Sequence, residues 1–351
     1  MNDTEPGGAK PSGAKRTIVY VANADSHDVA VLALEGAGGE LREVERFAVG
    51  GIVMPLAASP DRRFLYASIR SEPHRVVSLA IDPASGRLAM LGSAPLPASM
   101  CWISTDGSGR FLLSASYGSS RVAVSPIGGD GVAAAAQQVI PTEANAHAFR
   151  THPSNRFAFA ACLGGGVVRQ WRFDAGSGRL DDNASPAWQA RPGAGPRHFA
   201  FHPSGPWMYL LNELDAGIDV LRCDAADGAL ASLQTVSALP PGTIGEPWAA
   251  DIHLTPDGRF LYASERRSST LSAFAVDAGS GLLKPLGAIA TEAQPRGFAV
   301  TPDGRFLIAA GQASHRLSCY AIDAAGGALA KLGDRAVGQN PNWVAIVELD
   351  A

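Results

Sequence analysis

Four charged or titratable side chains, His147, Arg197, Glu213 and Arg266, occupy matching positions around a proline-centred turn that recurs along the chain. His147 and Arg197 each lie six residues before the proline of a turn. Glu213 and Arg266 each lie six residues after the aromatic residue that follows one. Arginines neutralise an anion and polarise a carbonyl group, while a carboxylate or an imidazole can move a proton. These residue types predict chemistry on an anionic substrate with a carbonyl group, in which Glu213 or His147 activates water and Arg197 stabilises an oxyanion.

Equivalent positions in other copies of the turn, and residues beside them, hold further candidates for binding a substrate. They are Arg296, Arg70, Tyr117, Gln312, Asp251 and His198. Arg296 and Arg266 are suited to hold an anionic group. The alternative interpretation is that these charges form salt bridges between repeats. The sequence has no His, Asp or Glu spacing typical of a metal site and no G-x-S-x-G motif, so we expect neither a cofactor nor a serine nucleophile.

The turn belongs to a long internal repeat. The heptapeptide Thr-Pro-Asp-Gly-Arg-Phe-Leu occurs at 255–261 and at 301–307, and degenerate copies begin at Ser59, Thr105, His152 and His202. The prolines at positions 60, 153, 203, 256 and 302 are 46 to 53 residues apart, except for one interval that spans two repeats. A repeat of this length is typical of arrays of small units that cannot bury their hydrophobic faces alone.

Each repeat has the pattern of four β-strands. Apolar and polar residues alternate on both sides of the Pro-Asp-Gly turn, in which aspartate caps the backbone and glycine supplies a positive φ. Seven repeats predict an all-β, seven-bladed β-propeller with four antiparallel strands per blade. The first repeat lacks its opening strand and the chain ends in an unpaired one at 343–349, so we expect the C-terminal strand to close blade one. We expect a disordered tail over 1–15 and one domain over 16–351.

The predicted strands bring Arg197 and Glu213 together. Arg197 enters one strand of a blade and Glu213 leaves its antiparallel neighbour, 16 residues later, so both belong to the same end of the sheet. A neighbouring arginine would keep Glu213 ionised. We expect Glu213→Gln and Arg197→Met to reduce activity while folding stays nearly intact.

Composition excludes several classes of partner. The 351 residues include 29 basic and 33 acidic side chains, for a net charge of −4, which does not favour nucleic acid or an anionic membrane. No apolar run approaches the length that spans a bilayer, and the N-terminal segment lacks the apolar core of a signal peptide. The four cysteines show no C-x-x-C spacing and are expected to be free thiols. We therefore expect a cytoplasmic monomer or weak homo-oligomer that binds a small anionic molecule.

Several longer strings resemble the seven-bladed propeller lactonases, a family that includes bacterial propeller-type 6-phosphogluconolactonases and fungal carboxy-muconate lactonizing enzymes. The strings are Gly195-Pro196-Arg197-His198, Asn212-Glu213-Leu214, and the segments 117–120, 248–258, 294–298 and 307–315. The resemblance runs from about Arg16 to the end of the chain. It implies a His, two Arg and a Glu as the active-site set, at His147, Arg197, Glu213 and Arg266. It also implies hydrolysis of 6-phospho-D-glucono-1,5-lactone to 6-phosphogluconate, in the pentose phosphate pathway.

Two positions depart from the pattern of the bacterial phosphogluconolactonases. Trp102 stands where those tend to carry a histidine, and the loop 163–166 has three glycines where they tend to carry a lysine. Both changes make the site less cationic, so cyclisation of a carboxy-muconate and hydrolysis of an unphosphorylated sugar-acid lactone stay open as alternatives. A non-catalytic propeller that binds protein partners is a further alternative.

Overall fold

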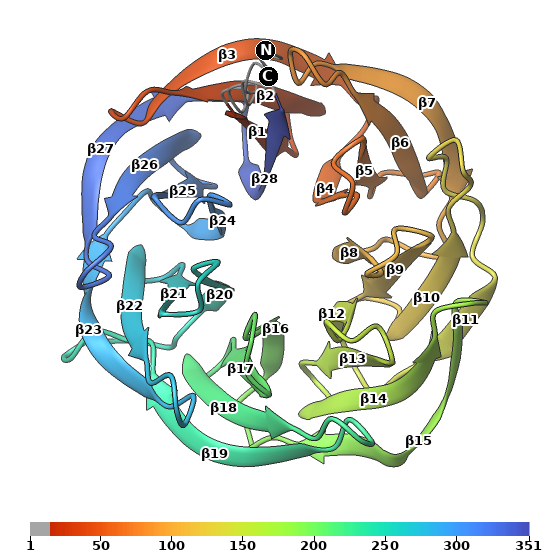
Figure 1. The fold of residues 1–351 in the computed structure, drawn as a ribbon, viewed down its shortest axis with the longest axis vertical. Coiled ribbons are helices and arrows are strands. Elements are labelled where there is room, and N and C mark those ends of the chain that lie inside the picture. The colour runs from red at the N-terminus through yellow and green to blue at the C-terminus, as the bar shows by residue number, and fades with distance from the viewer. Residues whose placement is uncertain (1–14, 351) are drawn as a thin grey trace, which may run out of the picture.

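The computed structural model describes residues 15–350, which form seven four-stranded antiparallel sheets and contain no helix in that range. The sheets follow one another around a ring, each as one blade of a propeller (Figure 1). The predicted all-β, seven-bladed fold is confirmed. The predicted disordered tail lies outside the described residues, except for Lys15, which already belongs to the first strand.

Each blade places one strand at the centre of the ring and three more outwards (Figure 1). The innermost strands are β28 (Pro341–Asp350), β4 (Val53–Ala58), β8 (Trp102–Thr105), β12 (Ala146–Thr151), β16 (Pro196–Phe201), β20 (Ala249–Leu254) and β24 (Pro295–Val300). The second strands are β1 (Lys15–Asn23), β5 (Phe64–Ile69), β9 (Phe111–Ser116), β13 (Phe157–Cys162), β17 (Trp207–Asn212), β21 (Phe260–Glu265) and β25 (Phe306–Gly311).

The two outer positions complete each blade. The third strands are β2 (Asp28–Glu35), β6 (Arg75–Ile81), β10 (Arg121–Pro126), β14 (Val167–Asp174), β18 (Gly217–Cys223), β22 (Thr270–Val276) and β26 (Arg316–Ile322). The outermost strands are β3 (Glu40–Ala48), β7 (Leu88–Pro95), β11 (Gln138–Pro141), β15 (Arg179–Gln189), β19 (Leu230–Ser237), β23 (Leu283–Ala290) and β27 (Leu329–Ala336).

The ring is closed by pairing the two ends of the chain. Strand β28 takes the innermost place in blade one and pairs with β1 from Lys15↔Asp350 to Asn23↔Pro341 (Figure 1). The predicted closure of blade one is therefore confirmed. The pairing satisfies the inner edge of β1, which would otherwise expose unpaired backbone groups.

The turn between the innermost and second strands has the hydrogen bonds that its sequence predicts. In blade six the Thr255 hydroxyl donates to the Asp257 carboxylate at 2.5 Å, and that carboxylate accepts the Arg259 backbone N–H at 3.1 Å. In blade five His202 replaces the threonine, and its Nδ1 accepts the Gly205 backbone N–H at 2.8 Å. These caps fix the entry of each second strand and so the register of the blade.

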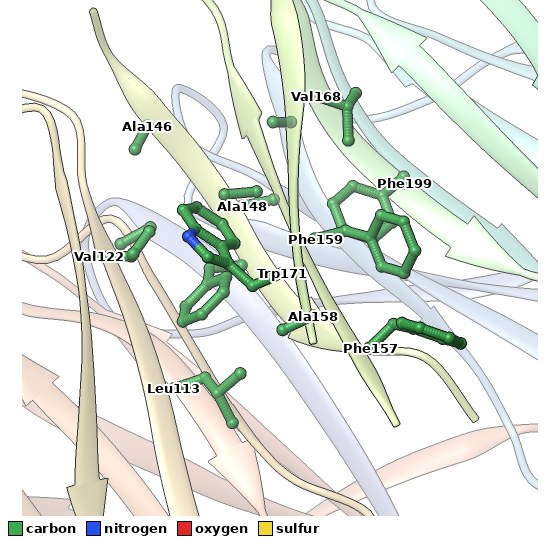
Figure 2. Packing of buried hydrophobic residues seen from close by; sticks show 14 of the residues in the cluster. Leu113, Val122, Ala146, Ala148, Phe157, Ala158, Phe159, Val168, Trp171 and Phe199 are labelled. Carbon is green, nitrogen blue, oxygen red and sulfur yellow. The ribbon is translucent and has the colours of Figure 1, made fainter. Parts of the chain in front are cut away.

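Hydrophobic side chains pack across the boundaries between blades. Figure 2 shows Phe159 and Trp171 of blade four in one cluster with Leu113 of blade three and Phe199 of blade five. Trp171 is almost fully buried and meets the ring of Phe149 edge to face, with centroids 5.7 Å apart. No blade of this cluster buries its faces alone, so each blade holds its neighbours in place.

A glycine at each joint lets neighbouring blades approach closely. Gly281, in the turn between β22 and β23, has a φ of +73°, and an added Cβ would overlap the indole of Trp207 in the preceding blade. The Gly281 carbonyl also accepts the buried Tyr209 hydroxyl at 2.9 Å. The same steric fit recurs at six joints, between Ile18 and Gly86, Phe64 and Gly131, Phe111 and Gly178, Phe157 and Gly228, Trp207 and Gly281, and Phe260 and Gly327. At the seventh joint an added Cβ at Gly39 would overlap Leu332 and Cys319 of the preceding blade.

The joint predicts a difference between two glycine substitutions that share the same backbone strain. Gly281→Ala and Gly242→Ala both place a side chain at positive φ, but an added Cβ at Gly242 has no neighbour within 4 Å. Gly242→Ala should lower the unfolding free energy by about 1 kcal/mol. Gly281→Ala should lower it by a further ~1–3 kcal/mol from overpacking against Trp207. Urea titration measures both, and equal losses would argue against the steric joint.

Candidate active site

A ring of backbone hydrogen bonds forms one mouth of the propeller. In six blades the residue just past the second strand donates its N–H to a carbonyl just before the innermost strand. The pairs are Ala24 with Asn340, Arg70 with Ile52, Leu163 with Asn145, Glu213 with Gly195, Arg266 with Trp248, and Gln312 with Gln294. The two sets of positions that the sequence analysis compared therefore meet at the same end of the blades.

A bulge at the start of several innermost strands sets the direction of the side chains that lie six residues before the proline of the turn. The ladder register shifts between Ala146 and Ala148, between Pro196 and His198, and between Pro295 and Gly297, which leaves one residue of each strand unpaired. A β-bulge re-aims the side chain of its extra residue. The unpaired residues of these strands and of β28 are His147, Arg197, Arg296 and Asn342, and each strand follows a residue at positive φ: Asn145, Gly195, Gln294 and Asn340.

Arg197 and Arg266 share one carboxylate oxygen of Glu213. Arg197 Nε donates to Glu213 Oε2 at 2.6 Å, and Arg266 Nη2 lies 2.9 Å from the same atom. Arg197 is completely buried and also donates from Nη1 to the Ala250 carbonyl. Burial raises the pKa of Glu213, but the attraction of Arg197 and Arg266 and their hydrogen bonds outweigh it and hold the pKa below its usual value. The expected contact between Arg197 and Glu213 is present, and Glu213 is ionised at neutral pH.

Arg266 is fixed on three sides. Its Nε and Nη2 donate to the carbonyls of Trp248 and Ala249, each at 3.1 Å, and its guanidinium lies 3.8 Å from the centre of the Trp248 ring. Stacking on an aromatic face adds a cation–π attraction. The guanidinium is therefore held rigidly before any ligand arrives.

His147, His198 and Asp251 come from the innermost strands of three consecutive blades. The His198 Nδ1 and the Asp251 carboxylate are 2.8 Å apart, and the His147 and His198 ring centres are 5.0 Å apart. Burial, followed by repulsion from Arg197, lowers the pKa of His147 well below its ordinary value. The same causes lower the pKa of His198 to about 3, against the opposing effect of Asp251. Both imidazoles are neutral at neutral pH.

The site carries more positive than negative charge. Within residues 15–350, neither Arg296 nor Arg70 has a carboxylate within 4.0 Å, and Arg70 donates from Nε to the Ser99 hydroxyl at 2.9 Å. Burial, and then repulsion from Arg197, lowers the pKa of Arg296. Guanidinium groups nevertheless keep their charge in proteins. Buried Nη atoms of Arg197 and Arg296 lack a hydrogen-bond partner among the described residues, and such groups call for water or an anion.

Two of the predicted binding residues stand at the edge of this cluster. Tyr117 is partly exposed and its ring centre is 5.8 Å from that of His147. Gln312 donates from its side-chain amide to the Asn340 side chain at 2.7 Å, which places it in the connection between blades rather than in contact with the arginines. The structure thus joins the other predicted residues through contacts or charge and leaves Gln312 apart.

Sequence analysis assigned no role to four residues that surround the site, although it noted Trp102 as a departure from the bacterial pattern. Trp248 stacks on Arg266, and Trp102 and Trp343 meet the His198 ring with centroids 4.8 and 5.9 Å away. Asn342 is fully buried and donates to the carbonyls of Asn340 and Val53, while its Oδ1 has no partner in the described part of the chain. The signal for Asn342 was present, because Pro341-Asn342-Trp343 repeats the pattern of Pro196-Arg197-His198.

Known proteins share this arrangement of blades. The profile described as "Lactonase, 7-bladed beta-propeller" matches residues 17–346. A 6-phosphogluconolactonase of Pectobacterium carotovorum is 43% identical over 333 residues, covering 95% of this chain and 99% of the relative. A 6-phosphogluconolactonase of Serratia proteamaculans is 40% identical over 95% of this chain and 99% of the relative. The solved structure of a periplasmic gluconolactonase from Pseudomonas aeruginosa superimposes with a TM-score of 0.89 at 29% identity, covering 96% of this chain and all of that one.

The chain therefore belongs to the seven-bladed β-propeller lactonase family. This finding confirms the resemblance and disfavours a non-catalytic binding module. It defines a carboxylic-ester hydrolase whose substrate is a small molecule. Across residues 15–350, no helix is both long and apolar enough to cross a membrane.

The burial of the ion cluster revises the expectation that Glu213→Gln leaves folding nearly intact. Removing the carboxylate would leave the buried guanidiniums of Arg197 and Arg266 facing each other without compensation. We now expect a loss of about 3 kcal/mol in unfolding free energy, at the low end for a broken buried pair because Glu213 keeps some solvent contact. Chemical denaturation measures this loss.

A surface pair is the matched control. Asp181 lies 2.8 Å from Arg179, with both side chains exposed, so Asp181→Asn should change the unfolding free energy by less than about 1 kcal/mol. A Glu213→Gln protein as stable as the Asp181→Asn protein would show that the cluster contributes nothing to folding.

Proposed function

We propose that the protein hydrolyses 6-phospho-D-glucono-1,5-lactone to 6-phosphogluconate, the second step of the pentose phosphate pathway. The observation that carries the proposal is the buried group of guanidiniums with a single shared carboxylate at the mouth of the propeller. Such a site favours a substrate with both a phosphate and a carbonyl group. The names of the relatives at 40–43% identity support the same substrate.

In the proposed mechanism His147 is the general base. Glu213 is a poor base, because two arginines lower its pKa and occupy one of its oxygens. His147 is neutral, and a neutral imidazole has a lone pair for a proton. Water attacks the lactone carbonyl carbon and its proton passes to His147. The ring C–O bond then breaks, and the same proton goes to the leaving ring oxygen, which becomes a hydroxyl group.

The arginines have separate parts in this proposal. Arg197 stabilises the oxyanion through its unpaired Nη2, while Glu213 and Arg266 hold Arg197 in place. Arg296 holds the phosphate, and the positive charge of Arg70 acts on the same region. Neither arginine has a carboxylate partner in the described residues. Tyr117 borders the substrate. The side-chain amide of Gln312 donates to Asn340, so Gln312 is a weak candidate for contact with the substrate.

The proposed reaction needs no cofactor, because the lactone is already a reactive ester. We further propose a cytoplasmic protein that acts as a monomer or weak homo-oligomer, with no nucleic-acid or membrane partner. Hydrolysis of an unphosphorylated sugar-acid lactone is the second candidate. It is favoured by Trp102, which gives the His198 side of the site an apolar wall, and by the name of the gluconolactonase structure.

Lactone disappearance, corrected for spontaneous hydrolysis, tests the activity. Arg197→Met should lower kcat/KM per folded enzyme by roughly 10²–10³-fold, since one oxyanion donor is lost. Arg296→Met should raise KM for the phosphorylated lactone and leave kinetics on glucono-1,5-lactone nearly unchanged. No acceleration at micromolar enzyme would refute the proposal, and equal kcat/KM for the two lactones would favour the second candidate.

The pH dependence of kcat/KM tests the base. A base works only when unprotonated, and the pKa of His147 is held well below its ordinary value, so activity should stay constant from neutrality through pH 6.5 and fall only at a clearly lower pH. Glucono-1,5-lactone is the better substrate here, because a phosphate ester has its own pKa near ~6. The acidic fall should vanish in His147→Gln together with about 10²–10⁴-fold of the rate. An unchanged profile in that variant would remove His147 from the mechanism.

A further inference from the structure

A carboxylate and two imidazoles form a chain along the centre of the propeller. Asp251 on β20 contacts His198 on β16 at 2.8 Å, and the His198 ring centre lies 5.0 Å from that of His147 on β12. All three side chains are buried. Two further contacts fix the Asp251 carboxylate, which accepts the Ile252 backbone N–H at 3.0 Å and contacts His253 Nε2 at 3.2 Å.

The protonation of His198 follows from these contacts. Burial raises the pKa of Asp251, but His253 and His198 outweigh burial and hold it well below its usual value, so Asp251 is ionised. An ionised carboxylate only accepts hydrogen bonds. The proton of neutral His198 must therefore lie on Nδ1, which leaves Nε2 as an acceptor.

Two buried nitrogens of this chain lack a partner among the described residues, His198 Nε2 and His147 Nδ1. They belong to neighbouring rings, and His198 Nε2 is an acceptor that needs a donor. The two atoms make no direct hydrogen bond with each other in the described part of the chain. A proton on His147 Nδ1 would satisfy both through one bridging water, which accepts from His147 Nδ1 and donates to His198 Nε2. The other nitrogen of His147, Nε2, would then carry its lone pair.

We propose that Asp251 and His198 are positioning residues that hold His147 in the tautomer with a proton on Nδ1 and a free lone pair on Nε2. The inference rests on the role of His147 as base in the proposed function. It changes the predicted part of His198 and Asp251, which then act through His147 rather than by contact with the substrate. Fixing the tautomer of a catalytic histidine through its second nitrogen is a general device in acid–base catalysis.

The surroundings of the chain explain why it stays neutral. The titratable, charged and aromatic groups that face it from the packed elements are Arg197, Arg296, Arg266, Tyr117, Trp102, Trp343, His253 and Arg150. Nearby positive charge disfavours an imidazolium, so the proton on each ring is the single one of a neutral imidazole. Within residues 15–350, Asp251 is the one carboxylate within 4.0 Å of either imidazole. It contacts His198, whose Nδ1 donates to it.

The tautomers can be observed directly in the resting enzyme. Long-range 15N–1H spectra of protein labelled at histidine distinguish a proton on Nδ1 from one on Nε2. The expected result is Nδ1–H for both His147 and His198 in the wild type, with a mixture of tautomers for His147 in His198→Leu. A proton on Nε2 of His147 in the wild type would overturn the proposal.

Kinetics of matched variants add a second measure. His198→Leu should lower kcat on the lactone by about 10–10²-fold with little change in KM, part of the ~10²–10⁴-fold that a general base supplies. His198→Gln keeps an acceptor for His147 and a donor for Asp251, and should recover most of that loss. Equal losses in the two variants at equal Tm would contradict positioning.

The pH profile separates positioning from a structural role. Asp251→Asn removes the negative charge of the chain that ends at His147. A protonated His147 then becomes less favourable, so the acidic limb of kcat/KM, which reports His147, should move to lower pH. His253→Gln is the control, because His253 contacts the other oxygen of Asp251 and is partly exposed; its limb should not move. An unmoved limb in Asp251→Asn would overturn the proposal. If the wild type hydrolyses no lactone but shows the expected tautomers, the proposed function fails and the hydrogen-bond chain stands.

Discussion

The close fit between one blade and the next is the constraint on which the rest of this structure depends. A blade of four short strands cannot exclude water from both of its faces, and the clusters of buried side chains cross the boundaries between blades. A glycine at each joint permits that approach, because any side chain there would meet a residue of the preceding blade. Seven such joints fix the ring, and the ring fixes the distance between innermost strands. The spacing of the charged side chains at its mouth is therefore a property of the whole fold.

Within that frame, small irregularities select which side chains face the mouth. An ideal innermost strand would alternate its residues between its two faces. The bulges that follow Asn145, Gly195 and Gln294 break this alternation and turn His147, Arg197 and Arg296 out of register. The carboxylate of Glu213 then pairs with the guanidiniums of Arg197 and Arg266, while Arg296 has no carboxylate partner in the described residues. The resulting site is preorganised for a negatively charged ligand, because its charges are placed by backbone geometry.

Repetition in the sequence made much of this accessible. The proline-centred turns set the number of blades and the closing strand, and the same turns allowed positions to be compared from blade to blade, which grouped Arg197 with Glu213 and Arg266. The comparison failed where the pattern was interrupted. Asn342 lies in the closing strand β28, which is not followed by the proline-centred turn. Trp248 lies at the end of the long loop that leads into β20. The pairing of His198 with Asp251 joins separate blades, and its geometry depends on burial and on side-chain orientation that residue spacing does not encode.

The closure of blade one has a consequence for the order in which the protein is made. Among the described strands β28 is the last to be synthesised, yet it sits beside β1 at the centre of the ring and brings Asn342 and Trp343 to the mouth (Figure 1). A growing chain that has completed six blades still has an open ring and lacks one wall of the site. Assembly of the active form is thus a late event, in which the final strand completes fold and binding site in the same step.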